Sequence, residues 1–243
     1  MTYLRIIPSL LLKNKRLIKG VKFKNHMIAG NPKTTIQTFD SQKSDEIFLI
    51  DFDAYNNSRP DFEELKKITT TINTPLTFGG GLNSIENIKL SFLNGADKVY
   101  ISSAIQNNDK IIEDVSLIYG NQSIVGGINL IADSNNFSML NYDINPISFA
   151  KKLVDLGVGE IKITFVNLEG SRKGFNLSIC EKFLKNIKIP LIFEGGIGSL
   201  EDIEKAANAG VQNIALGTLL IFSDYNIFKI KQHLSNKGYK IRN

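Results

Sequence analysis

The sequence is poor in the residues that disulfide-stabilised and metal-binding proteins depend on. Its 243 residues include one cysteine, Cys180, two histidines, His26 and His233, and no tryptophan. A single cysteine cannot form an internal disulfide or a cysteine-based metal site, which excludes a disulfide scaffold. Neither histidine has a recognisable partner, and no group of histidine, aspartate and glutamate has the spacing of metal ligands. We therefore expect neither a metal ion nor a cofactor.

Long apolar runs are also absent. The longest, residues 6–12, contains Pro8 and is far shorter than the about 20 residues that span a bilayer. It has no small-residue cleavage site, so we interpret it as a strand rather than as a secretory signal. These features predict a soluble, cytoplasmic protein without a membrane partner.

Positive charge is in slight excess but is not concentrated. The chain has 29 lysines and arginines against 24 aspartates and glutamates, and apart from residues 13–24 and a basic C-terminal tail the positive residues are scattered. Nucleic-acid-binding proteins more often carry a basic stripe with interleaved aromatic residues. We therefore expect no nucleic-acid partner and interpret the charge as a solvated surface that weakly attracts anionic ligands.

Short apolar segments alternate with helical patterns along the chain. Helical periodicity is clear at residues 84–93, 146–156 and 200–209. Runs rich in Ile, Val and Phe predict eight strands, at residues 4–10, 47–51, 76–78, 98–101, 124–128, 160–165, 191–193 and 213–216. Strands that alternate with helices predict a parallel sheet, and eight repeats in about 250 residues favour a closed (β/α)8 barrel over an open sheet. No linker interrupts the pattern, so we expect residues 1–243 to form one domain.

An internal repeat strengthens the barrel prediction. Residues 74–105, TPLTFGGGLNSIENIKLSFLNGADKVYISSAI, align without gaps to residues 189–220, IPLIFEGGIGSLEDIEKAANAGVQNIALGTLL. The offset is 115 positions throughout, as from Pro75 to Pro190. This is about half of the chain, so the sequence predicts two duplicated half-barrels.

Each copy of the repeat contains a strand, a Gly-Gly pair and a serine, Ser84 or Ser199, that can cap the following helix. Backbone N–H groups beside glycines, together with small residues at the end of the next strand, can form a phosphate cradle at the C-terminal face of a barrel. One copy could equally be a tight turn. Two copies favour phosphate binding, at two places suited to a ligand with phosphate at both ends.

Charged residues stand at both ends of the predicted strands. Asp51 and Asp53 follow the second strand and Glu169 follows the sixth, where carboxylates are more often catalytic or ligand-binding than structural, although Asp53 is equally explained as a loop cap. Four further charged residues begin strands one, two, four and six, namely Arg5, Glu46, Lys98 and Glu160. Alternation could place these four in a ring inside the barrel, which is costly to bury unless it is paired. From spacing alone, four independent surface charges are the better interpretation.

The chain resembles the cyclase subunit of imidazole glycerol phosphate synthase in five segments: RIIPSLLLKNKRLIKGVKF, DEIFLIDFDA, FGGGLNSIENIKLSFLNGADKVYISSA, GVGEIKITFVNLEGSRKGFN and EGGIGSLEDIEKAANAG. The resemblance is collinear from about residue 3 to 242. It implies a (β/α)8 barrel that binds a substrate with two phosphates, and a glutaminase partner at the bottom of the barrel. Ammonia would pass through the barrel to a lyase site at the top, in histidine biosynthesis.

The resemblance also implies roles for individual positions. The four charged residues at the strand starts match the family's salt-bridge ring, which gates ammonia, and this reverses the interpretation from spacing. Lys19 and Asp51 match active-site positions. The implied phosphate-binding positions are Gly81, Ser102 and Ser103 on one side, and Gly170, Gly196, Gly217 and Thr218 on the other. Ser102 stands where the family usually has Asn, and Gly217 where it usually has Ala.

The sequence departs from the family at the positions of its catalytic residues. The cyclase uses two catalytic aspartates, at the ends of strands one and five, and this sequence has Leu11 and Asn129 there. Asn167 and Glu169 also stand where the family usually has aspartates. A positioned acid or base contributes roughly 10²- to 10⁴-fold to a rate, so the loss of both aspartates predicts that cyclisation is lost.

A second branch of the family fits this pattern better. Cyclase-like paralogues from surface-saccharide loci read L-L-L-K where the true cyclase reads L-D-V-K, and residues 10–13 here are LLLK. The resemblance to that branch implies a barrel that passes glutamine-derived ammonia to an N-acetyl sugar amidotransferase. Two alternatives stay open. One is a true cyclase whose acid–base work has moved to Glu169 or Asp51, and the other is a non-catalytic regulator that binds a phosphorylated ligand.

Overall fold

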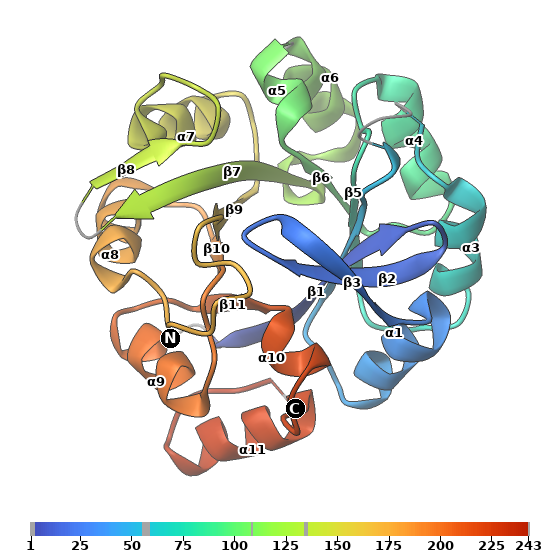
Figure 1. Ribbon diagram of the computed structural model, residues 1–243. Helices are drawn as coiled ribbons and strands as arrows, with labels where there is room; N and C mark the ends of the chain where they lie inside the picture. The colour runs from blue at the N-terminus through green and yellow to red at the C-terminus, as the bar shows by residue number, and fades with distance from the viewer. Residues whose placement is uncertain (1–2, 55–58, 108, 134–135, 243) are drawn as a thin grey trace.

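A closed ring of eight parallel strands forms the centre of the molecule (Figure 1). The computed structural model describes residues 3–54, 59–107, 109–133 and 136–242. In their order around the ring the strands are β1 (Arg5–Lys13), β4 (Ile47–Asp51), β5 (Leu76–Gly79), β6 (Lys98–Ile101), β7 (Ile124–Asp133), β9 (Glu160–Phe165), β10 (Leu191–Glu194) and β11 (Asn213–Leu216). β11 pairs with β1, with Asn213 opposite Arg5, so the ring closes. The predicted (β/α)8 barrel and its eight strands are confirmed.

Helices surround this ring and cover its outer face (Figure 1). They are α1 (Pro32–Ser41), α3 (Phe62–Thr69), α4 (Ile85–Leu93), α5 (Ser103–Asn107), α6 (Lys110–Tyr119), α7 (Pro146–Asp155), α8 (Leu177–Asn186), α9 (Leu200–Asn208), α10 (Thr218–Ile221) and α11 (Ile227–Asn236), with the 3-10 helix η1 (Asn121–Ser123). Each long helix buries one apolar face; in α8 this face is Ile179, Cys180 and Phe183. Removal of this apolar surface from water drives the helices onto the strands.

The two copies of the sequence repeat fold alike, as β5–α4–β6 and as β10–α9–β11. Their serines cap the helices as predicted. The Ser84 side chain accepts a hydrogen bond from the backbone N–H of Asn87, and the Ser199 side chain accepts one from Asp202, both at 3.2 Å. In α9 the Asp202 carboxylate also accepts from the Ser199 N–H at 3.0 Å, which completes a capping box.

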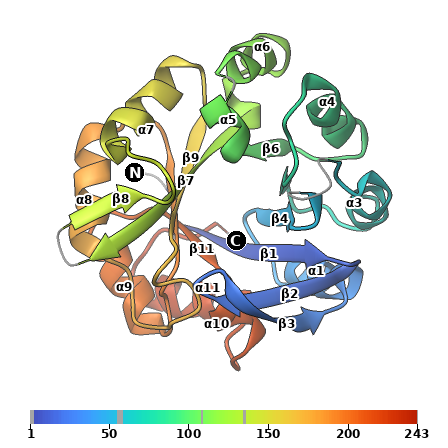
Figure 2. The same ribbon diagram turned by 45° about the horizontal axis from the view of Figure 1, so that its top comes forward.

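Three strands were not predicted. β2 (Arg16–Val21) and β3 (Lys24–Gly30) form an antiparallel hairpin that continues from β1, and β8 (Asn136–Met139) pairs with β7. Because the hairpin follows the C-terminal end of β1, it lies at the end of the barrel where the strands finish (Figures 1 and 2). We call this end the top.

The tight turns next to β2 explain why the hairpin could not be predicted from the sequence. Two residues, Asn14 and Lys15, join β1 to β2, and Lys22 and Phe23 join β2 to β3. All four have positive φ, between 48° and 59°. Positive φ at both central residues is the geometry of type I′ hairpin turns, which usually carry Asn-Gly or Asp-Gly. Lys-Phe in this conformation gives no such sequence signal.

Side chains, and not a pore, fill the inside of the barrel. The apolar middle layer consists of Ile7, Phe48, Tyr100, Val125, Ile192 and Ala215. A closed ring of eight strands has an interior just wide enough to be filled in this way. Charged and polar side chains lie at both ends of this apolar layer, and they form the sites considered next.

Candidate functional site

Four charged residues form a closed ring at the bottom of the barrel. Arg5 contacts Glu46 at 3.1 Å and Glu160 at 2.7 Å, and Lys98 contacts the same two carboxylates at 2.9 Å and 2.6 Å. Each cation therefore bridges both anions. The structure brings together the four residues that the sequence had marked, and they are not independent surface charges.

The pairing within this ring outweighs the cost of burial. Burial alone would raise the pKa of Glu160 and lower that of Lys98. Contacts with Arg5 and Lys98 nevertheless lower the pKa of Glu160, and contacts with Glu46 and Glu160 raise the pKa of Lys98. Thr77 donates a further hydrogen bond to Glu46 at 2.5 Å. The pKa shifts of Lys98 and Glu160 thus favour their charged forms, and two cations face two carboxylates in the ring.

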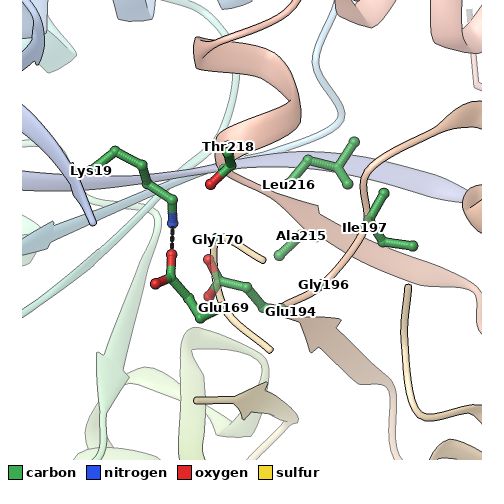
Figure 3. Close-up of a pocket in the computed structure, with 11 residues that line it drawn as sticks. Lys19, Glu169, Gly170, Glu194, Gly196, Ile197, Ala215, Leu216 and Thr218 are labelled. Carbon is green, nitrogen blue, oxygen red and sulfur yellow. Dashed lines mark ion pairs between the residues drawn. The ribbon is translucent and has the colours of Figure 1, made fainter. Parts of the chain in front are cut away.

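A pocket opens at the top of the barrel, between the ends of β10 and β11 and the hairpin (Figure 3). Its lining includes four of the predicted phosphate-binding residues, Gly170, Gly196, Gly217 and Thr218. Among the described residues the Thr218 hydroxyl oxygen is buried without a hydrogen-bond partner. Gly196 has φ of 109° and Gly170 has φ of 72°, conformations that glycine adopts without strain. The pocket thus combines backbone conformations suited to glycine with an unsatisfied hydroxyl group.

Lys19 and Glu169 form a buried ion pair on the wall of this pocket (Figure 3). Lys19 comes from β2 of the hairpin, and Glu169 from the loop after β9. The same loop is bound to the turn of the hairpin, because the N–H of Lys22 donates to the Glu169 carbonyl oxygen at 2.9 Å. The hairpin that the sequence did not predict therefore places one of the two site residues.

The position of Lys19 gives a physical reason for glycine at 217. A Cβ atom at this position would lie 2.6 Å from Nζ of Lys19 and 2.7 Å from its Cε. An alanine there, as is usual in the family that the sequence resembles, would force Lys19 to move.

The other predicted phosphate-binding residues lie elsewhere on the top face. Gly81 follows β5, and Ser102 and Ser103 follow β6, so none of them lines the pocket beside Lys19. Gly81 has φ of 63°, and a Cβ there would lie 2.7 Å from Cβ of Ala54. The Ser102 hydroxyl donates to the Gly127 carbonyl oxygen at 3.4 Å. The two groups of residues thus follow different strands, β5 and β6 for one group and β9, β10 and β11 for the other.

The aspartates after β4 hold the backbone of neighbouring loops. The buried Asp51 carboxylate accepts hydrogen bonds from the N–H groups of Ala54 at 3.1 Å and Asp61 at 2.8 Å. Burial raises the pKa of Asp51, and these two hydrogen bonds oppose that shift. Asp53 accepts from the N–H of Asn14 at 2.6 Å, which fits the alternative that it is a loop cap.

The positions where the resembled family has catalytic aspartates lie at the top of the barrel. Leu11 is near the end of β1, opposite Ile18 of β2 and Ile50 of β4, and Asn129 is in the last part of β7. Asn167 makes two hydrogen bonds to the backbone of Ala132: its Oδ1 accepts from the N–H at 3.1 Å and its Nδ2 donates to the carbonyl oxygen at 2.6 Å. An aspartate could not donate the second bond, so the amide at 167 is explained by its local contacts.

Sequence reasoning missed a second buried ion pair, between Lys162 on β9 and Glu194 on β10. Glu194 also lines the top pocket. The available signal was the alternation in β9, where Glu160, Lys162 and Thr164 share the inward face. It also missed the partner of His233, whose Nε2 lies 2.5 Å from the Glu204 carboxylate, contrary to our expectation that neither histidine has one.

Two negative findings hold within the described part of the chain. No group of three or more histidine, cysteine, aspartate or glutamate residues is arranged to hold a metal ion. No helix there has the length and apolarity needed to cross a membrane.

Comparison with known proteins gives consistent matches over the whole barrel. Residues 5–226 match the family model described as "Histidine biosynthesis protein". A candidate imidazole glycerol phosphate synthase subunit hisF2 of Campylobacter jejuni is 31% identical over 242 residues, which cover 98% of each chain. The imidazole glycerol phosphate synthase subunits HisF of Sulfolobus acidocaldarius and Sulfurisphaera tokodaii are each 34% identical, and each match covers 100% of both chains.

Proposed function

The chain belongs to the histidine biosynthesis protein family, and from this premise we propose that it receives ammonia from a glutaminase partner and passes it on for amidation of an N-acetyl sugar. The observation that carries the proposal is an asymmetry between the two ends of the barrel. The bottom keeps a complete ring of paired charges, whereas Leu11 and Asn129 leave the top without acid–base groups at two key positions.

The ring is suited to control entry into the barrel from the bottom. Glu46 and Glu160 each bind Arg5 and Lys98, so one cation can release its carboxylates while the other retains them. Rupture of a buried ion pair without replacement is costly, which keeps the ring closed until something else binds the freed groups. A glutaminase docked on this face supplies both the ammonia and such contacts.

The groups at the top support the loss of cyclase chemistry. Glu169 is engaged by Lys19, and both oxygens of Asp51 accept backbone hydrogen bonds. Each carboxylate would therefore have to give up these contacts in order to replace one of the missing aspartates as an acid or base. The pocket beside Gly196 and Thr218 retains the features of a phosphate cradle, so we include a phosphorylated ligand in the proposal.

The alternative is a genuine cyclase of histidine biosynthesis. The names of the relatives favour it, as does the presence of the Glu169 carboxylate on the pocket wall. In that case Glu169 would have to leave Lys19 during the reaction in order to transfer a proton.

A cyclase assay distinguishes these two functions. Purified protein is supplied with ammonium and the phosphoribulosyl intermediate, and the subunit from Sulfolobus acidocaldarius serves as the positive control. We expect no measurable turnover, and no growth when the gene is placed in a cyclase-deficient auxotroph. Turnover at the rate of the control, or growth of the auxotroph, would overturn the proposal in favour of the cyclase.

A second measurement concerns the glutaminase. Addition of this protein to its glutaminase partner is expected to raise the rate of glutamine hydrolysis. An unchanged rate would instead favour the third possibility, a ligand-binding regulator that conducts no ammonia.

A further inference from the structure

Lys162 is fully enclosed within the barrel, although the proposed function gives it no role. Its ammonium group forms the ion pair with Glu194 and donates a hydrogen bond to the Thr164 hydroxyl at 3.3 Å. It also lies 5.4 Å from the ring centre of Phe48 and 5.1 Å from that of Tyr100. A cation at this distance from an aromatic face is attracted to it.

These contacts place the ammonium group of Lys162 in the interior of the barrel, between side chains from opposite walls. Around the closed ring the strands follow the order β1, β4, β5, β6, β7, β9, β10, β11. Lys162 belongs to β9, whereas Phe48 belongs to β4, four places away on the opposite wall. Tyr100 and Glu194 come from β6 and β10. The ammonium group thus contacts three walls other than its own, in the middle layer above the charged ring.

The ion pair holds this arrangement in place. Burial by itself would lower the pKa of Lys162 and raise the pKa of Glu194. The attraction between the two charges outweighs this effect, so the pKa of Lys162 is raised and the pKa of Glu194 is lowered. Both are therefore charged, and separation of either would leave an unpaired buried charge. Thr164 and the two aromatic rings fix the direction of the lysine further.

We propose that Lys162 is a second closure of the barrel axis, one layer above the charged ring, and that it must leave Glu194 before a small molecule can pass to the top pocket. The second half of this statement rests on the proposed function, because it takes ammonia as the molecule that passes. Glu194 also lines that pocket, so the group that holds the closure lies where a bound ligand would meet it.

The closure itself is tested without any assumption about function. Crystals of the wild-type protein and of the double variant Lys162→Ala/Glu194→Gln are pressurised with xenon, which occupies apolar cavities. We expect xenon on the axis between Phe48 and Tyr100 in the variant only. Xenon at this place in the wild type, or its absence from a folded variant, would overturn the closure. The double substitution removes both charges together, so it leaves no unpaired carboxylate.

The consequence for transfer is tested in the complex with glutaminase and an N-acetyl sugar amidotransferase. [Amide-15N]glutamine is supplied in unlabelled ammonium buffer, and the rate of 15N incorporation into the amidated sugar is measured. For the double variant we expect an increase of about tenfold, the effect of removing about 1.4 kcal/mol from the closed state. If the alanine variant does not fold, Lys162→Met/Glu194→Gln retains the side-chain volume and removes the ion pair. An increase in the rate of 15N incorporation is expected for this variant too.

The matched control is Lys205→Met/Glu201→Gln, which removes an exposed pair on α9 with a separation of 2.8 Å and should leave the rate unchanged. Transfer by the wild type with no change in the double variant would overturn Lys162 as a barrier. The absence of 15N transfer in the wild type would instead overturn the proposed function, while the xenon result would still decide the closure.

Discussion

At the scale of single residues, the protein differs from the family that its sequence resembles in ways that its contacts explain. Gly217 leaves room for the Lys19 ammonium group, and Asn167 uses both its donor and its acceptor on the backbone of Ala132. Leu11 and Asn129 are different, because neither a leucine nor an asparagine side chain can exchange a proton as an aspartate does. Local contacts therefore account for the first two departures, and the last two are the departures on which the proposed function rests.

The first prediction concerns Glu160 and pH. Its pKa in the folded protein is lowered by Arg5 and Lys98, so its contribution to stability is complete above the unfolded pKa of about 4.3 and is lost as the pH falls towards the folded value. Urea unfolding of Glu160→Gln should therefore show a shallower loss of stability than the wild type between about pH 5 and pH 3. Equal slopes in the two proteins would contradict this prediction. Glu201→Gln, which removes a fully exposed pair, should scarcely alter the slope.

The second prediction concerns the two missing aspartates. Leu11→Asp combined with Asn129→Asp restores the residue types of the resembled cyclase at the ends of β1 and β7. We expect the double variant to form imidazole glycerol phosphate from ammonia and the phosphoribulosyl intermediate at a measurable rate, and each single variant to form much less. No gain in the double variant would show that further positions, such as Glu169, have also diverged.

At the scale of elements, short-range chemistry decided where helices begin, whereas the hairpin depended on conformations that its sequence does not favour. Ser84 and Ser199 begin their helices with side-chain caps, as their spacing predicted. The hairpin of β2 and β3 turns through residues with positive φ that are not glycine. It nevertheless positions Lys19, so an element without a sequence signal completes the pocket.

The third prediction compares the two caps. Ser199→Ala removes the side-chain acceptor of a complete capping box, and Ser84→Ala removes a simple cap in the equivalent copy. Each should lower the free energy of unfolding by about 1 kcal/mol, and the change should be greater for Ser199 because its removal disrupts a reciprocal pair. Urea denaturation measures both, and an effect at Ser84 larger than that at Ser199 would contradict the argument.

At the scale of the whole molecule, the barrel depends on contacts that bring the two ends of the chain together. β11 pairs with β1, and Leu4 forms a bridge with Ile241. On α11, Lys231 donates to the Asp45 carboxylate at 2.8 Å and to the carbonyl oxygen of Lys43 at 2.6 Å. The last helix is therefore fixed to the bottom of the barrel by a charge that is itself buried.

The fourth prediction tests this attachment. Lys231→Met leaves the buried Asp45 carboxylate without its cation, which should cost about 3 kcal/mol of stability in urea unfolding. Lys229→Met changes an exposed lysine of the same helix and should alter stability by less than about 0.5 kcal/mol. Equal effects of the two substitutions would show that the ion pair contributes nothing specific.

The fifth prediction concerns the charged ring in the complex with glutaminase. In Lys98→Ala, Arg5 is the one cation of the ring that Glu46 and Glu160 retain, so the ring opens on one side. We expect glutamine hydrolysis to continue while the fraction of its ammonia that reaches the acceptor falls. The exposed pair between Lys152 and Asp109 provides the control Lys152→Ala. An unchanged ratio of transfer to hydrolysis in Lys98→Ala would separate the ring from the passage of ammonia.

The class of fold, the order of the eight strands and the residue types of the ring could be predicted from the amino-acid sequence. Strand and helix patterns are local, and a repeat offset by 115 positions can be read without coordinates. Tertiary structure was needed to show that Arg5 and Lys98 share the same two carboxylates, and that Lys162 pairs with Glu194 of the neighbouring strand and meets Phe48 of the opposite wall. These contacts join residues far apart in sequence, and closure of the ring sets which inward-facing side chains meet.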